Sequence, residues 1–145
     1  GKKLGYKIFI GKREQPELYN SKKLSTFADL NSLDFIEDKT KRARIEMIDV
    51  LWIDNNQNIK FALEVENSTN FTSGVQRASN LEINTSKLMI VPDERKKEFK
   101  ALADPLFIDN FKHYNWRYLY YSAVERLASS QKIDIKDVDN YTENQ

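Results

Sequence analysis

Short apolar runs bounded by glycine, proline or polar turns recur along this chain and predict a series of β-strands. The predicted strands cover residues 6–11, 44–54, 59–67, 87–92 and 116–121. The polar stretch "NNQN" at residues 55–58 is typical of a hairpin turn. The second and third strands should therefore pair in an antiparallel arrangement.

Segments between these strands carry apolar residues at helical spacing and predict α-helices. The predicted helices cover residues 32–38, 73–84, 94–103 and 123–131, with caps at Thr72 or Ser73, at Asp93 and at Ser122. Strands interleaved with helices indicate an α/β fold, namely a central mixed β-sheet flanked by helices. We expect one domain over residues 1–139 and a disordered tail over residues 140–145.

Composition narrows the class of protein and the kind of metal site. With 145 residues and 40% hydrophobic content, the chain can bury one sizeable core, and no stretch is apolar for long enough to span a membrane. Zero cysteines suit a reducing compartment, so we expect a cytoplasmic protein without a membrane partner. Since His113 is the single histidine, a metal here should be a hard cation held by oxygen atoms.

Charge is balanced in total but clustered along the chain. The 23 basic and 22 acidic residues nearly cancel, yet "KTKRAR" at 39–44 and "ERKKEFK" at 94–100 are basic clusters. Such clusters most often form solvated surface. They would also suit a polyanionic substrate if they flanked an acidic site.

Three carboxylates fall within the predicted hairpin where a core should form. Alternation places Glu64 and Glu66 on one face of their strand, and antiparallel pairing can bring Asp49 of the preceding strand near them. Close carboxylates repel, and Mg²⁺ between them would relieve that repulsion. Alternating acidic residues also occur on solvated strand faces. However, the apolar neighbours of Asp49 in "MIDVLW" are not typical of a solvent-exposed strand face.

The segment after the second strand of this hairpin suits a phosphate group. "NSTNFTSGVQR" offers hydroxyls, a helix start, and Ser73, Gln76 and Arg77 in the first turns of the predicted helix. Helix capping and a surface ion pair are the alternative roles for Gln76 and Arg77. Both interpretations stay open from the sequence.

Four blocks in order, "IEMIDVLWID", "FALEVENST", "SGVQRASNL" and "KLMIVPDERKKEF", resemble the PD-(D/E)XK nuclease superfamily and its restriction-endonuclease-like domains. The resemblance implies an αβββαβ core and a Mg²⁺-dependent DNA endonuclease of the type II restriction kind, with Mn²⁺ able to substitute. It implies that Asp49 and Glu64 bind the metal. Glu66 stands where the superfamily usually has lysine, and it would orient or deprotonate the attacking water. Ser73, Gln76 and Arg77 would lie on the substrate side.

The same resemblance implies partners. DNA is the expected substrate, an additional target-recognition domain should lie outside this chain, and double-strand cleavage would require a homodimer or two successive nicks. Because Glu66 replaces the lysine, a catalytically silent nuclease-fold domain that binds DNA or a partner protein is the rival hypothesis. A carboxylate-rich structural domain without a nucleic-acid role is the third.

Overall fold

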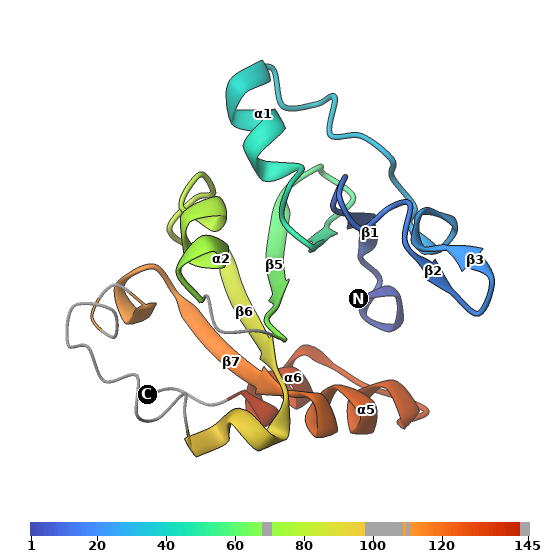
Figure 1. The fold of residues 1–145 in the computed structure, drawn as a ribbon, viewed down its shortest axis with the longest axis vertical. Helices are drawn as coiled ribbons and strands as arrows, with labels where there is room; N and C mark the ends of the chain where they lie inside the picture. The colour runs from blue at the N-terminus through green and yellow to red at the C-terminus, as the bar shows by residue number, and fades with distance from the viewer. Residues whose placement is uncertain (68–70, 98–108, 110, 143–145) are drawn as a thin grey trace.

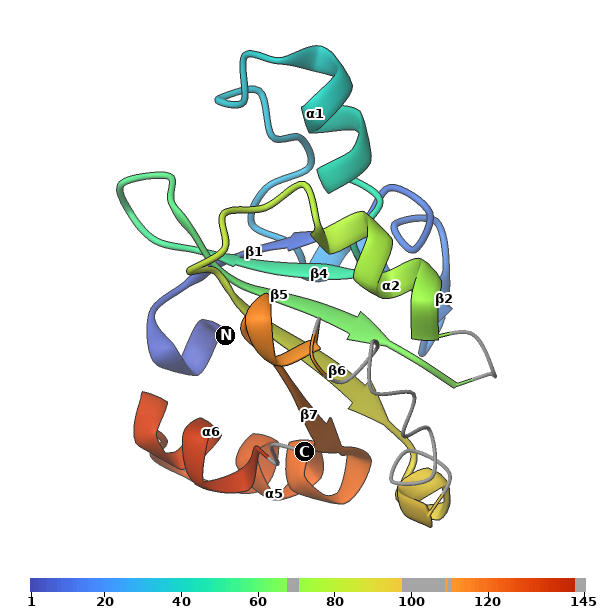
Figure 2. The same cartoon turned by 90° about the vertical axis from the view of Figure 1, so that its left-hand side faces the viewer.

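The computed structural model describes residues 1–67, 71–97, 109 and 111–142, except the side chains of residues 71–73. Its centre is a five-stranded sheet in the order β1-β4-β5-β6-β7. The strands are β1 (Lys7–Ile10), β4 (Val50–Ile53), β5 (Ile59–Val65), β6 (Ser86–Val91) and β7 (Trp116–Tyr120). Figure 2 shows them side by side in this order. Strands β1, β4 and β5 pair antiparallel, whereas β6 is parallel to β5 and to β7. The predicted mixed sheet is confirmed.

Helices cover both faces of this sheet (Figures 1 and 2). Helices α1 (Lys39–Ile45) and α2 (Phe71–Ala78) lie on one face, and α5 (Tyr121–Ser129) and α6 (Ile135–Tyr141) lie on the other. Each face has its own apolar cluster, because alternate strand residues point to opposite faces. Among the described helices, none is long and apolar enough to cross a membrane.

The packing explains the aromatic run before α5. Trp116, Tyr118, Leu119 and Tyr120 are all buried, so this run contributes to the core, as its alternating pattern suggests. The described part of the chain also contains smaller elements. They are η1 (Lys2–Leu4), β2 (Leu18–Tyr19), β3 (Lys22–Lys23), η2 (Leu24–Phe27) and η3 (Asp93–Arg95).

The first predicted helix is wrong in position, and so is the start of the second predicted strand. Residues 32–38 form no helix; instead Asp38 caps α1, its Oδ1 accepting a hydrogen bond of 2.9 Å from the Lys41 amide. Helix α1 runs through residues 39–45, and β4 begins at Val50. The Asp and Ser side chains of 32–38 favour turns and caps, while the Lys and Arg residues that follow are better helix formers.

The later helices also differ from the prediction. Helix α2 begins and ends earlier than the predicted segment 73–84. Asp93 belongs to a 3₁₀ turn, while residues 98–103 of the predicted helix lie outside the described residues. Ser122 does not cap α5, whose N-cap is Tyr120. The carboxylate of Asp93 instead accepts hydrogen bonds from the Ser122 amide, at 3.0 Å, and from its hydroxyl. Asp93 thereby connects the end of β6 to the first turn of α5.

Helix α6 was not predicted. Its start is a capping box, in which Asp134 accepts hydrogen bonds from the Lys136 and Asp137 amides and Asp137 accepts one from the Asp134 amide. Val138 buries one side of the helix against α5 and β7. The helix includes Asn140 and Tyr141, the first two residues of the expected tail, and residues 143–145 lie outside the described residues.

Candidate active site

Asp49 and Glu64 lie opposite each other across the β4–β5 pair. Asp49 immediately precedes β4, and the register pairs the next residue, Val50, with Leu63. The Asp49 Oδ2 accepts a 2.7 Å hydrogen bond from the Val65 amide, which fixes its carboxylate beside β5. The hairpin thus brings together two of the predicted site residues, as the antiparallel pairing required.

Glu64 is fully buried and binds Arg77 of α2 through both carboxylate oxygens. Arg77 Nε donates to Glu64 Oε1 at 2.9 Å, and Arg77 Nη2 donates to Glu64 Oε2 at 2.6 Å. Burial raises the pKa of Glu64 to about 8, the Arg77 hydrogen bonds oppose that rise, and the neighbouring Asp49 carboxyl adds to it. Glu64 is therefore an acid whose charge depends on a cation beside it.

Glu66 follows the end of β5 and remains in the sheet, because its amide donates a 2.9 Å hydrogen bond to the Ile90 carbonyl. Its side chain is 8% exposed and faces α2 beside Glu64. A Cβ added at Gly74 would lie 3.3 Å from Cβ and Cγ of Glu64 and 3.4 Å from Oε1 of Glu66. Burial raises the pKa of Glu66, while the charges of Arg77 and Arg95 lower it. The two glutamates thus share one face, as predicted, and Gly74 lets the helix pack close to both.

The predicted substrate-side residues all lie on α2, but only part of their geometry is described. Ser73 belongs to the first turn of α2, and its side chain lies outside the described part of the chain. Gln76 is exposed and, with Arg77, lines a shallow depression of about 420 Å³ next to the carboxylates. Arg44, Met47, Ser79 and Asn80 complete that lining.

Glu14 is a site residue that the sequence did not indicate. It lies in the loop after β1, close to the Asp49 carboxyl, and its pKa is raised first by burial and then by the Asp49 charge. The loop reaches this position because the Gly11 amide donates a 2.8 Å hydrogen bond to the Asp49 carbonyl. Glu14 and Asp49 are 35 positions apart in the sequence, and no local pattern predicts a contact between them. The basic residue Arg44, at the end of α1, was likewise missed as a neighbour of Arg77.

These contacts make one acidic cluster beside the Arg77 guanidinium, and we call Glu14, Asp49, Glu64 and Glu66 the acidic cluster. The charge of Arg77 lowers the pKa of Glu14, Glu64 and Glu66, and the charges of Asp49, Glu64 and Glu66 in turn raise the pKa of Arg77. Within the described part of the chain, no three acids or histidines form a ready metal cage. The donor set nevertheless fits Mg²⁺, which binds one or two carboxylates and completes its shell with water and phosphate oxygens.

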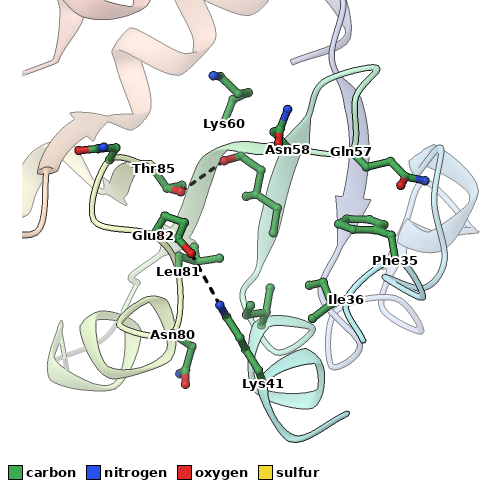
Figure 3. A pocket seen from close by; sticks show the side chains of 13 residues that line it. Phe35, Ile36, Lys41, Gln57, Asn58, Lys60, Asn80, Leu81, Glu82 and Thr85 are labelled. Carbon is green, nitrogen blue, oxygen red and sulfur yellow. Dashed lines mark hydrogen bonds and ion pairs between the residues drawn. The ribbon is translucent and has the colours of Figure 1, made fainter. Parts of the chain in front are cut away.

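A second cavity, of about 440 Å³, lies at the far end of β5 (Figure 3). It is lined by Phe35, Ile36, Lys41, Gln57, Asn58, Asn80, Glu82 and other residues, and a Lys41–Glu82 ion pair of 3.8 Å crosses it. Glu64 lies five positions further along β5 than Ile59, which lines this cavity, and that separation is about 17 Å along a β-strand. No member of the acidic cluster lines this cavity, so it is a separate feature.

Gly11 should be the glycine of this region least tolerant of substitution. A Cβ there would lie 2.4 Å from the Ile48 carbonyl oxygen and 3.3 Å from Asp49 Cα, both backbone atoms that cannot rotate away. We expect Gly11→Ala to lower the free energy of unfolding by about 1–3 kcal/mol, as overpacking does. Urea denaturation would measure it. Gly74→Ala is the matched control and should cost less, because its neighbours are side-chain atoms and alanine favours the helix. Equal losses would contradict this account.

Comparison with known proteins places the chain in a restriction-enzyme family. The family model described as "Type II restriction enzyme NmeDI C-terminal domain" matches residues 1–143. The type II restriction enzyme NmeDI of Neisseria meningitidis serogroup C is 31% identical over 141 residues, covering 89% of this chain and 39% of the relative. The chain thus spans about two fifths of the length of that relative. No solved structure matches. Since the family model covers almost the whole sequence, the chain belongs to the family of the type II restriction enzyme NmeDI C-terminal domain.

Proposed function

We propose that this chain is the DNA-cleaving domain of a restriction enzyme and hydrolyses phosphodiester bonds with Mg²⁺ at the acidic cluster. The observation that carries the proposal is the convergence of Asp49, Glu64 and Glu66 beneath α2, in the order that resembles the PD-(D/E)XK nucleases. Membership of a restriction-enzyme family supports a role on DNA. Incubating the protein with supercoiled plasmid in Mg²⁺, Mn²⁺ or EDTA tests it.

In this proposal Asp49, just before β4, and Glu64, on β5, would hold the metal. A bound Mg²⁺ lowers the pKa of a coordinated water and stabilises charge on the phosphate. Glu66, beside Glu64 and 8% exposed, accepts the proton of the attacking water. Its raised pKa suits that task, because a general base works best when its pKa approaches the working pH.

Phosphate groups would approach from the α2 side of the acidic cluster. Arg44 and Gln76 line the depression there, and the exposed Lys39 and Lys41 extend the positive charge along α1. Cationic side chains that contact phosphates give sequence-independent affinity and position the duplex. The basic cluster on α1 is therefore assigned to the DNA backbone.

Arg44→Ala should weaken DNA binding and reduce its salt dependence. If Arg44 contacts one phosphate, the slope of log affinity against log salt should become shallower by about one unit. Fluorescence anisotropy with a labelled duplex, in EDTA, would measure it. Lys132→Ala is the control, because Lys132 is an exposed residue between α5 and α6 on the other face of the sheet. Equal slopes in parent and Arg44→Ala would remove Arg44 from the interface.

Metal affinity should rise with pH, since Glu64 must lose its proton to bind a cation. Burial raises the pKa of Glu64 to about 8, so between pH 6 and 8 Mg²⁺ competes with a proton. We expect the association constant to increase up to about tenfold per pH unit in that window and to level off above it. Calorimetric titrations at several pH values would measure it. An affinity independent of pH would show that Glu64 does not exchange a proton for the metal.

A silent nuclease-fold domain is the second candidate, favoured by Glu66 in place of the usual lysine. It would bind DNA or a partner protein without cleaving. The cleavage proposal also includes target recognition by another part of the protein and a dimer that cuts both strands. The chain covers 39% of the relative, which is consistent with recognition by a further domain.

A further inference from the structure

Arg77 occupies the position on Glu64 that a metal would need. Its Nε and Nη2 take both oxygens of the carboxylate, at 2.9 and 2.6 Å, in a bidentate ion pair. Glu64 is 0% exposed, so a cation cannot reach a free side of this group without displacing the guanidinium. Metal and Arg77 therefore exclude each other on Glu64.

The Arg77 side chain has open space beside it, into which the guanidinium could move. Its side chain is 20% exposed and already lines the depression beside Arg44 and Gln76. The backbone of Arg77 is fixed at the end of α2, because its carbonyl accepts a 3.0 Å hydrogen bond from the side-chain amide of Asn80. A rotation about side-chain bonds would carry the guanidinium from Glu64 into the depression while α2 stays in place. That depression is where the proposed function puts a DNA phosphate.

We propose that Arg77 is an internal cation that closes the metal site in the absence of metal and is displaced into the DNA-facing depression when a divalent cation binds Glu64. The inference rests on the proposed function, because it concerns the same acidic cluster. The charge balance supports it: Glu64, Asp49 and Glu66 all act on Arg77, and replacing one positive charge by two compensates these three carboxyls better. The alternative is a fixed structural ion pair that never opens.

The first test measures Mg²⁺ binding by calorimetry at pH 8.5, without DNA. Arg77→Met keeps the aliphatic stem but removes the competing guanidinium, so it should bind Mg²⁺ about tenfold more tightly than the parent, the scale of a lost charge-assisted pair. Because removing Arg77 also raises the pKa of Glu64, each variant is titrated at pH 8.5 and above, and affinities are compared where they no longer rise with pH. Arg126→Met is the control, because Arg126 is exposed on α5 on the other face of the sheet, and it should leave Mg²⁺ affinity unchanged.

The second test follows Arg77 itself in protein labelled with ¹⁵N-arginine. Without metal the Arg77 Nε–H is hydrogen-bonded and should exchange slowly with solvent; saturating Mg²⁺ should shift its signal and speed that exchange. Arg77→Lys, which retains charge but lacks the fork, covers the case in which Arg77→Met unfolds, and it should also bind Mg²⁺ more tightly. Binding that is equal or weaker in these variants, with a protected Arg77 signal in metal, would overturn the inference. If parent and variants all fail to bind Mg²⁺, the proposed metal site itself is wrong.

Discussion

Replacing Asp49 with asparagine should lower plasmid cleavage by about a thousandfold, since losing a metal ligand removes several kcal/mol of charge stabilisation in the transition state. Asparagine keeps the size of the side chain and an oxygen that can accept the Val65 amide hydrogen bond, so the fold should survive. The change also removes one negative charge next to Glu64. Rates measured at saturating DNA, together with a thermal unfolding curve, would separate chemistry from stability.

Asp54→Asn is the matched control for this variant. Asp54 lies just after β4, at the other end of the same strand, where its Oδ1 accepts hydrogen bonds from the Asn56 and Asn58 amides at 2.8 and 2.9 Å. The chemical change is the same, but the residue is outside the acidic cluster. We expect Asp54→Asn to cleave DNA at the parental rate. Similar losses in both variants would mean that the hairpin, and not the Asp49 carboxylate, had been damaged.

Glu66→Gln should lower cleavage by about a hundredfold while DNA binding persists, the scale typical of losing a general base. Glutamine keeps the length of the side chain and much of its hydrogen bonding, so the close packing against Gly74 should remain. Glu66→Lys introduces the lysine that PD-(D/E)XK nucleases usually have at this position, and it should cleave DNA faster than Glu66→Gln. Single-turnover cleavage with excess enzyme is the measurement.

Glu82→Gln serves as the control, because Glu82 is exposed and forms an ion pair with Lys41 in the separate cavity of Figure 3. It should leave the cleavage rate unchanged. Parental cleavage by Glu66→Gln, with activity still lost in Asp49→Asn, would make Glu66 a bystander. That result would leave Asp49 and Glu64 as the acids that matter.

The strands and the three central acids could be predicted from the sequence because both depend on short-range periodicity. Alternation fixed which side of β5 carries Glu64 and Glu66, and a polar turn of four residues fixed the partner strand. The register then placed Asp49 without any knowledge of the rest of the fold.

The features that the sequence did not predict depend on packing between distant segments or on a local choice between helix and solvated tail. Glu14 meets Asp49 through a loop with no periodic pattern, and Arg77 finds Glu64 only once α2 lies across β5. Helix α6 was overlooked because its acidic, polar sequence resembles a solvated tail, although Asp134 and Asp137 form a capping box. A single buried residue, Val138, decides that this segment packs.

Plasmid cleavage and DNA binding, measured in the same buffers, decide whether this domain is a metal-dependent nuclease. Supercoiled DNA is incubated with the full-length protein in Mg²⁺, in Mn²⁺ or in EDTA, and DNA binding is recorded in the same buffers. We expect nicked or linear DNA in Mg²⁺ and Mn²⁺, no cleavage in EDTA, and loss of cleavage in Asp49→Asn with binding retained. DNA that is bound in the presence of metal yet stays supercoiled would contradict it and identify a silent nuclease-fold domain.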